Sequence, residues 1–166
     1  MYQDIRTDLH ETFGKLMDTL SSLSEDQLNK SPYTGSWTAA QVGDHLSRSY
    51  GIIELLDGNT TPSSQPVSEK VQEIKALFLN FEIQMESPAF ILPSEGWIAK
   101  EQLLLDLEQK THGILDSMNS RDLSVSCLDF ELPGSGILMG WEWIHFINYH
   151  TQRHLYQLDK IRTKLA

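Results

Sequence analysis

Apolar residues recur every three or four positions through most of this chain, a spacing that gathers them on one face of a helix. In the segment Ile5 to Leu23 these positions are Ile5, Leu9, Phe13, Leu16 and Leu20. The same period returns in Trp37 to Gly58, Trp97 to Met118 and Gly140 to Lys164. We therefore expect four long helices that bury their apolar stripes against one another.

Two of the expected helices begin with a capping signature. Ser24 is followed three residues later by Gln27, and Thr38 by Gln41, so each hydroxyl can accept a backbone N–H while the amide reaches back to the cap. Residues 30–36 between them are rich in proline, glycine and hydroxyl side chains, which favours a loop. A short helical turn from Ser24 and a long helix from Thr38 are predicted.

The connection between the second and third long helices is itself long. Residues 59–66 are polar and are interpreted as a linker, whereas Val67 to Met85 again has helical spacing. Ser87 to Pro93 cannot be regular helix, because two prolines restrict the residues before them. This connection is therefore expected to carry an extra helical segment.

Arg121 to Leu138 contains one proline and two glycines and is interpreted as an irregular loop, with at most a brief extended stretch around Val125 to Leu132. The chain of 166 residues is long enough for one core and short for two. The predicted fold is a single all-α domain over residues 1–166. It is a four-helix bundle with long crossover connections and an extra helical segment between helices two and three.

Three histidines lie on the apolar stripes. His150 and His154 are four residues apart, which stacks their side chains on one face of the last helix, and His45 lies on the inward stripe of the second. Two such imidazoles and a third from a neighbouring helix can bind one divalent metal and leave positions open for water or substrate. The other histidines, His10, His112 and His145, have no helical partner.

Spacing by itself does not separate a metal site from histidines buried in a core. With six histidines in this length, a pair four residues apart arises by chance in about one sequence in six. Placement favours the metal, because three imidazoles buried without partners would cost roughly 1–3 kcal/mol each. A hydrogen-bonded histidine core stays open as the alternative.

Composition excludes some classes of function. A formal net charge of −10 with scattered lysines and arginines argues against nucleic acid binding. Cys127 is the single cysteine, so a disulfide framework is excluded, and it is expected to be a small buried hydrophobe. No apolar run approaches a membrane span and the N-terminus does not resemble a signal peptide, so a cytoplasmic protein is expected.

Two motifs resemble those of a known family. Residues 37–46, WTAAQVGDHL, are similar to the second-helix pattern W-x-x-x-x-x-x-x-H-L of the DinB-like (YfiT-like) superfamily. Residues 150–158, HTQRHLYQL, resemble the H-x-x-x-H-x-x-Q-[LI] signature of that family's last helix. The order of the other segments fits as well, so the resemblance covers nearly the whole chain, although only these two motifs are specific.

The resemblance implies a four-helix bundle with a three-histidine metal centre, usually zinc or nickel, in a cleft between helices. Carried over to the matching positions, the ligands are His45, His150 and His154. The Val67 to Met85 segment departs from the family pattern, and could narrow the cleft or form a dimer contact. Related bundles often pair through their helices, so a homodimer is expected.

Other polar residues have weaker signals. Gln41 and Gln157 lie near the ligand positions and could orient a ligand or bound water, with a helix cap and a solvated side chain as the respective alternatives. Asp44 and Glu142 are not expected to act, because helical geometry puts neither on the histidine stripe. The four tryptophans are interpreted as core and helix-end packing.

A centre of this kind supports two reactions on a small molecule. Bound water as nucleophile would make the protein a hydrolase, and a thiolate of the bacillithiol or mycothiol type, as the resemblance implies, would make it an S-transferase. Both would use the same three ligands. The alternative is a non-catalytic metal-binding or stress-associated interaction module with the same bundle.

Overall fold

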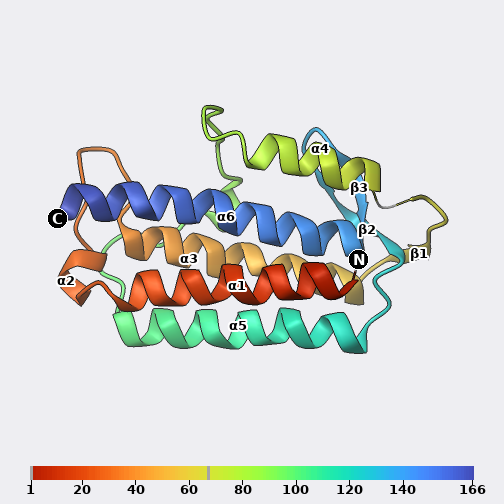
Figure 1. Ribbon diagram of the computed structural model, residues 1–166, viewed down its shortest axis with the longest axis horizontal. Coiled ribbons are helices and arrows are strands. Elements are labelled where there is room, and N and C mark those ends of the chain that lie inside the picture. Colours follow the sequence, from red (N-terminus) through yellow and green to blue (C-terminus); the bar gives the residue numbers. More distant parts are fainter. Residues whose placement is uncertain (1, 67) are drawn as a thin grey trace.

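Four long helices form a bundle in the computed structural model, which describes residues 2–66 and 68–166 (Figure 1). They are α1 (Tyr2–Ser21), α3 (Ala39–Ser49), α5 (Lys100–Ser120) and α6 (Gly140–Leu165). Helix α1 packs against α5 and α6, and α3 packs against the same two. Helices α1 and α6 run in one direction, and α3 and α5 in the other. Since α3 and α5 are consecutive and parallel, a long crossover must join them, as predicted.

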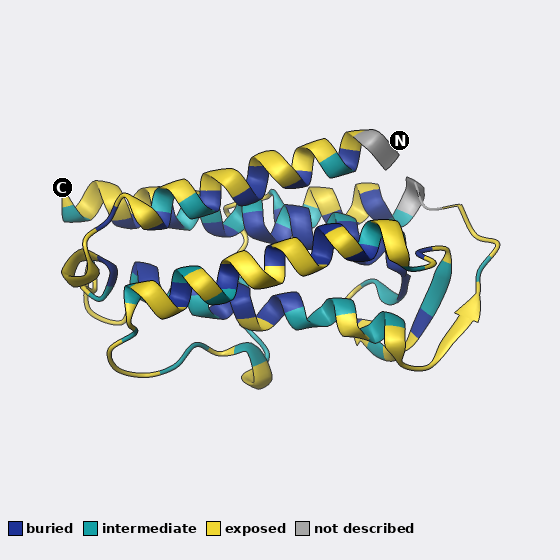
Figure 2. Cartoon of the chain, turned by 90° about the horizontal axis from the view of Figure 1, so that it is seen from below, coloured by how far each residue is buried: buried dark blue, intermediate teal, exposed yellow. Residues whose placement is uncertain are grey.

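The apolar stripes of the helices face the centre of the bundle, and the exposed residues lie on the outside (Figure 2). The stripe predicted for α1 is at most 4% exposed at each of its positions: Ile5, Leu9, Phe13, Leu16 and Leu20. Both capping boxes are present, at Ser24 before the short helix α2 (Glu25–Leu28) and at Thr38 before α3. The prediction of a four-helix bundle is confirmed.

The second long helix ends earlier than its apolar period indicates. Regular α-helix stops at Ser49, and the chain continues as the 3-10 helix η1 (Tyr50–Asp57). Tyr50 is 1% exposed, and its hydroxyl shares a 2.8 Å hydrogen bond with the hydroxyl of Thr151 on α6. Over eight residues, the spacing of apolar side chains does not distinguish an α-helix, with 3.6 residues per turn, from a 3-10 helix, with 3.0.

A small antiparallel sheet closes one end of the bundle, where the sequence was interpreted as loops. Its strands, in the order β1-β2-β3, are β1 (Thr60–Pro62), β2 (Val125–Leu132) and β3 (Gly136–Met139). The interpretation of residues 59–66 as a linker was therefore wrong at β1. The interpretation of Arg121 to Leu138 as an irregular loop was wrong at β3, whereas the brief extended stretch allowed at Val125 to Leu132 coincides with β2. Strand β2 lacks a strict alternation of buried and exposed residues and has a bulge between Cys127 and Glu131, so its strand signal is weak.

The crossover carries the helix α4 (Ser68–Phe78) and the 3-10 turn η2 (Ala89–Ile91), and α4 packs on the side of α6 away from α5 (Figure 1). The predicted helix Val67 to Met85 was thus too long, and Val67 itself lies outside the described residues. The helix ends at Phe78, and the Arg153 guanidinium on α6 donates to the carbonyls of Phe78, Asn80 and Ile83. A tertiary contact therefore holds the end of this helix.

Helix α5 begins at Lys100, three residues after the predicted start at Trp97. The Glu25 carboxylate accepts the Lys100 backbone N–H at 2.8 Å and the Trp97 indole N–H at 3.3 Å, and so caps this helix from α2. Trp97 itself is 61% exposed, so of the expected core and helix-end roles it has the one at the helix end. None of the described helices combines the length and apolar character needed to cross a membrane.

Candidate metal centre

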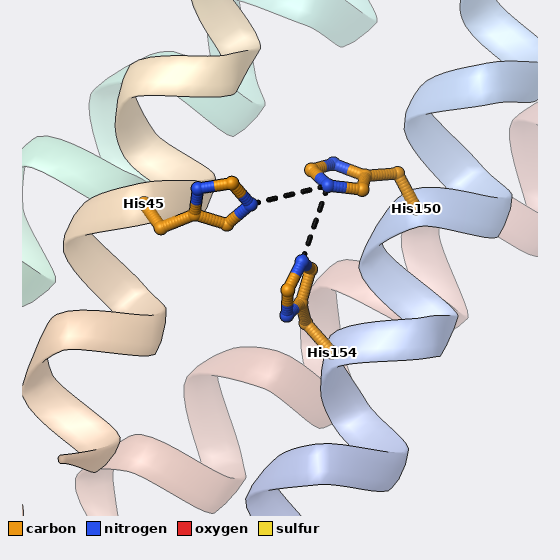
Figure 3. A group of neighbouring side chains, drawn as sticks. All are labelled: His45, His150 and His154. Carbon is orange, nitrogen blue, oxygen red and sulfur yellow. Dashed lines mark hydrogen bonds between the residues drawn. The ribbon is translucent and has the colours of Figure 1, made fainter. Parts of the chain in front are cut away.

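Three buried histidines meet between α3 and α6, although the chain separates the first from the other two by more than a hundred residues (Figure 3). Nε2 of His150 lies 3.2 Å from Nε2 of His45 and 3.1 Å from Nε2 of His154. One ring nitrogen of each residue lies within 4.8 Å of those of the other two. The structure thus brings together the three histidines that the sequence singled out.

Hydrogen bonds at the far ring nitrogens determine the tautomers of two of these histidines. His45 donates from Nδ1 to the backbone oxygen of Ile91 at 2.8 Å, and His154 donates from Nδ1 to Oε1 of Gln157 at 2.8 Å. A neutral imidazole carries one proton, so Nε2 of each ring presents a lone pair toward His150. Carbonyl groups at Nδ1 are the usual orienting partners of metal-binding histidines.

On its Nδ1 side, His150 is oriented by packing and not by a hydrogen bond. Its ring stacks on Phe146, with centroids 5.2 Å apart and planes at 12°, and meets the edge of Phe78 at 5.9 Å. Nδ1 is buried and has no hydrogen-bond partner within the described part of the chain. The histidine motif in the sequence carries no sign of this aromatic clamp, because Phe78 belongs to the crossover helix α4.

The three imidazoles are held in the neutral form. Burial is the main cause that lowers the pKa of His45, lowers that of His150 well below its usual value, and lowers that of His154 to about 3. The neighbouring histidines, and the Arg153 guanidinium for the pair on α6, lower the pKa of His150 and His154 further. Neutral imidazole is the form that binds metals.

The donor set fits a divalent metal better than it fits a closed hydrogen-bond network. His150 has one Nε2 proton at most, whereas both neighbouring Nε2 atoms already present lone pairs. At least one of the two short contacts at His150 therefore has no proton between its nitrogens, and a shared cation would stabilise it. Three neutral nitrogen ligands suit zinc, nickel, copper or iron.

The other polar residues considered from the sequence form hydrogen bonds with backbone groups. Gln41 closes the Thr38 capping box and donates to the Ser94 carbonyl at 3.2 Å, while the Asp44 carboxylate accepts the Ser94 N–H at 2.7 Å. Together they hold the loop in which the Ile91 carbonyl orients His45. Glu142 is buried and accepts the N–H of Met139 at the start of α6.

A cavity of about 1100 Å³ opens onto the three histidines. Its walls come from α3, α4, α6, β2 and the segment between α4 and α5. Trp37 lies against two of the histidine rings, with centroid distances of 5.0 Å to His45 and 6.4 Å to His154. Trp143 is 1% exposed and packs edge-on against Phe146. The expected packing role of these tryptophans therefore includes the wall of the site.

A family model describes most of this chain. Residues 8–158 match the model of the DinB superfamily. The chain belongs to the DinB superfamily. It is 23% identical over 150 residues to YuaE of Bacillus subtilis (strain 168), an uncharacterized protein, across 88% of this chain and 90% of the relative.

Two solved structures share the fold. TT2238, a four-helix bundle protein, superposes with a TM-score of 0.61 at 16% identity, across 96% of this chain and 99% of the other. YfiT from Bacillus subtilis, described as a probable metal-dependent hydrolase with an unusual four-helix bundle topology, has the same TM-score and identity. The match covers 98% of this chain and 86% of YfiT. At this identity the likeness concerns the fold.

Gln157→Leu should weaken metal binding by about 10–100-fold, the usual effect of losing a hydrogen bond to a ligand. The substitution removes the acceptor that orients His154 and keeps its Nδ1 protonated. Isothermal titration of the metal-free protein with zinc measures the change. Gln152→Leu is the matched control, because Gln152 lies on the same helix and makes no side-chain hydrogen bond among the described residues. Equal affinities of the two variants would contradict the role of Gln157.

The metal-free protein should lose stability as the pH falls below about 6.5. An unfolded histidine binds its proton near that pH, whereas folded His154 stays neutral down to about 3. Between these values the unfolded state holds more protons, so the free energy of unfolding decreases by up to about 1.4 kcal/mol per pH unit for each such histidine. Urea unfolding of chelator-treated protein at pH 7, 6 and 5 measures the slope, which should be shallower in His154→Leu. A slope unchanged by that substitution would refute the assignment.

Proposed function

We propose that this protein is a metal-dependent hydrolase acting on a small molecule, with His45, His150 and His154 as the metal ligands. The observation that carries the proposal is the meeting of three Nε2 atoms at the floor of an open cavity. The likeness to YfiT, a probable metal-dependent hydrolase, supports it. Zinc and nickel are the metals we expect, because neutral imidazole ligands suit both.

The residues around the site have defined parts in such a reaction. A dipositive ion on three neutral ligands supplies a Lewis acid that makes bound water a nucleophile near neutral pH. The Ile91 carbonyl and Gln157 keep a proton on Nδ1 of two ligands, and so keep Nε2 free to bind. Phe78 and Phe146 hold the third ring and shield it from solvent.

The carboxylates of Asp44 on α3 and Glu142 on α6 are engaged in hydrogen bonds of their own. Asp44 is engaged by the Arg48 side chain and by the Ser94 backbone, and Glu142 by the backbone of Met139. The protein's contribution is therefore to hold the metal in a partly dry cavity and to position a substrate. This arrangement favours substrates that metal-activated water can cleave without a separate acid, such as activated esters or lactones.

Hydrolysis of a panel of aryl esters and lactones tests the proposal. Protein reconstituted with zinc or nickel should turn over at least one member faster than chelator-treated protein, and His150→Ala should abolish the difference. Cys127→Ser is the control, since Cys127 is buried in β2 and is not part of the cavity lining. A rate that depends on an added thiol, with the thiol incorporated into product, would replace the hydrolase by an S-transferase. Metal uptake without either reaction would favour the non-catalytic module.

A further inference from the structure

Large hydrophobic side chains at the protein surface gather at the mouth of the cavity. Nine are exposed in the described part of the chain, and six of these line the cavity: Tyr33, Phe81, Ile83, Phe90, Leu92 and Tyr156. They come from the loop before α3, from the segment between α4 and α5, and from α6. Scattered apolar residues at a surface need no explanation, but a concentration around one opening indicates a binding surface.

The apolar lining continues inward to the histidines. The cavity lining also includes the aromatic residues Trp37, Phe130 and Phe146. The ring of Trp37 contacts that of His45. The cavity volume of about 1100 Å³ slightly exceeds the usual range for ligand sites, roughly 300–1,000 Å³. A small polar molecule would leave most of this apolar surface in contact with water. The lining therefore fits a ligand with a bulky apolar group.

Two cations lie at the same opening, although the chain as a whole carries a formal charge of −10. Arg153 and Lys160 both line the cavity from α6. The Arg153 guanidinium bonds only to backbone oxygens, and Lys160 lies 4.5 Å from the centre of the Tyr156 ring. Neither forms an ion pair with a carboxylate among the described residues, and Glu86 is the one acidic residue in the lining. The opening is therefore locally positive and suited to an anionic group.

We propose that the cavity binds a bulky amphipathic organic anion, an aromatic or long-chain acyl molecule with one carboxylate or similar group. The apolar body lies along the rim and the aromatic wall, and the anionic group lies beside Lys160 and Arg153. This inference rests on the proposed function in one respect: it names the substrate class of that site. Binding itself needs no metal, because the lining and both cations belong to the protein chain.

Two fluorescent probes with the same ring system separate the apolar contribution to binding affinity from the contribution of the anionic charge. 8-Anilino-1-naphthalenesulfonate carries a sulfonate, and N-phenyl-1-naphthylamine is its neutral counterpart. Natively folded, metal-free protein should bind the sulfonate saturably at one site, about tenfold more tightly than the amine, a ratio that corresponds to one ion pair of about 1.4 kcal/mol. Decanoate should displace the sulfonate better than decanol does.

Variants at the rim complete the test. Lys160→Gln should weaken binding of the sulfonate severalfold and leave the neutral amine unchanged, whereas Phe90→Ser should weaken both. Lys164→Gln is the matched control, because Lys164 is an exposed lysine of the same helix outside the cavity. Equal affinity for the two probes, an unchanged Lys160→Gln variant, or no saturable binding would overturn the proposal. Since metal is absent throughout, these outcomes do not depend on whether the protein is a hydrolase.

Discussion

Replacing His150 by alanine should abolish metal binding. His150 is the central histidine of the three, with Nε2 within 3.2 Å of Nε2 on both others, so its loss leaves only two of the proposed ligand nitrogens. Losing the hydrogen-bond partner of a ligand typically lowers metal affinity by about 10–100-fold. Because His150→Ala removes a proposed ligand itself, we expect its affinity for zinc or nickel to fall by more than this. Elemental mass spectrometry on protein purified without a histidine tag measures the metal content directly.

Thermal unfolding provides a second measurement of the same variant. A ligand that binds only the folded state stabilises it by about 4 kcal/mol at a thousandfold excess over its dissociation constant. Added zinc should therefore raise the melting temperature of the native sequence and leave that of His150→Ala unchanged. His145→Ala is the matched control, because His145 lies on the same helix and outside the histidine cluster. If His150→Ala bound metal as tightly as the control, the three-histidine site would be disproved.

The second large effect is expected at Gly140, where α6 begins. A Cβ atom on this residue would lie 2.8 Å from Cα and 2.9 Å from the backbone oxygen of Leu123. Backbone atoms cannot move aside as a flexible side chain can, so Gly140→Ala must push α6 away from the segment before β2. We expect the free energy of unfolding to decrease by about 1–3 kcal/mol, as overpacking of an interior usually costs. Urea unfolding measures this change.

Gly113→Ala is the matched control for this substitution. Gly113 lies within α5, and a Cβ atom there would meet nothing within 4 Å. Alanine is a better helix former than glycine by about 1 kcal/mol, so this variant should gain stability while Gly140→Ala loses it. A Gly140→Ala variant that is as stable as the native sequence, or more stable, would show that α6 does not approach Leu123 this closely.

Local sequence patterns were sufficient to predict the helical bundle and the inward orientation of its three histidines. The stripe of α1, the capping boxes at Ser24 and Thr38, and the long last helix depend on interactions between residues three or four positions apart. The same spacing placed His150 and His154 on one buried face of α6. These features follow from helix geometry, which is the same wherever the helix lies in the fold.

Most of the sheet was missed for the opposite reason, since only the extended stretch at Val125 to Leu132 had been considered. Strand β1 pairs with β2 across more than sixty residues of chain, and Thr60 lies opposite Cys127. A three-residue strand of exposed residues has no period that could be recognised, and its hydrogen bonds exist only because the partner strand is there. The end of α4 at Phe78 was missed in the same way, since the Arg153 guanidinium that holds this end belongs to α6.

The sequence by itself determined that the chain forms a helical bundle and that three histidines face inward, because both depend on the repeat of a helix. Only the tertiary structure decided that His45 reaches His150, that Ile91 and Gln157 hold the tautomers, and that an aromatic cavity with two cations opens above them. These arrangements join segments far apart in the chain, and their geometry arises only when the helices and the crossover pack together.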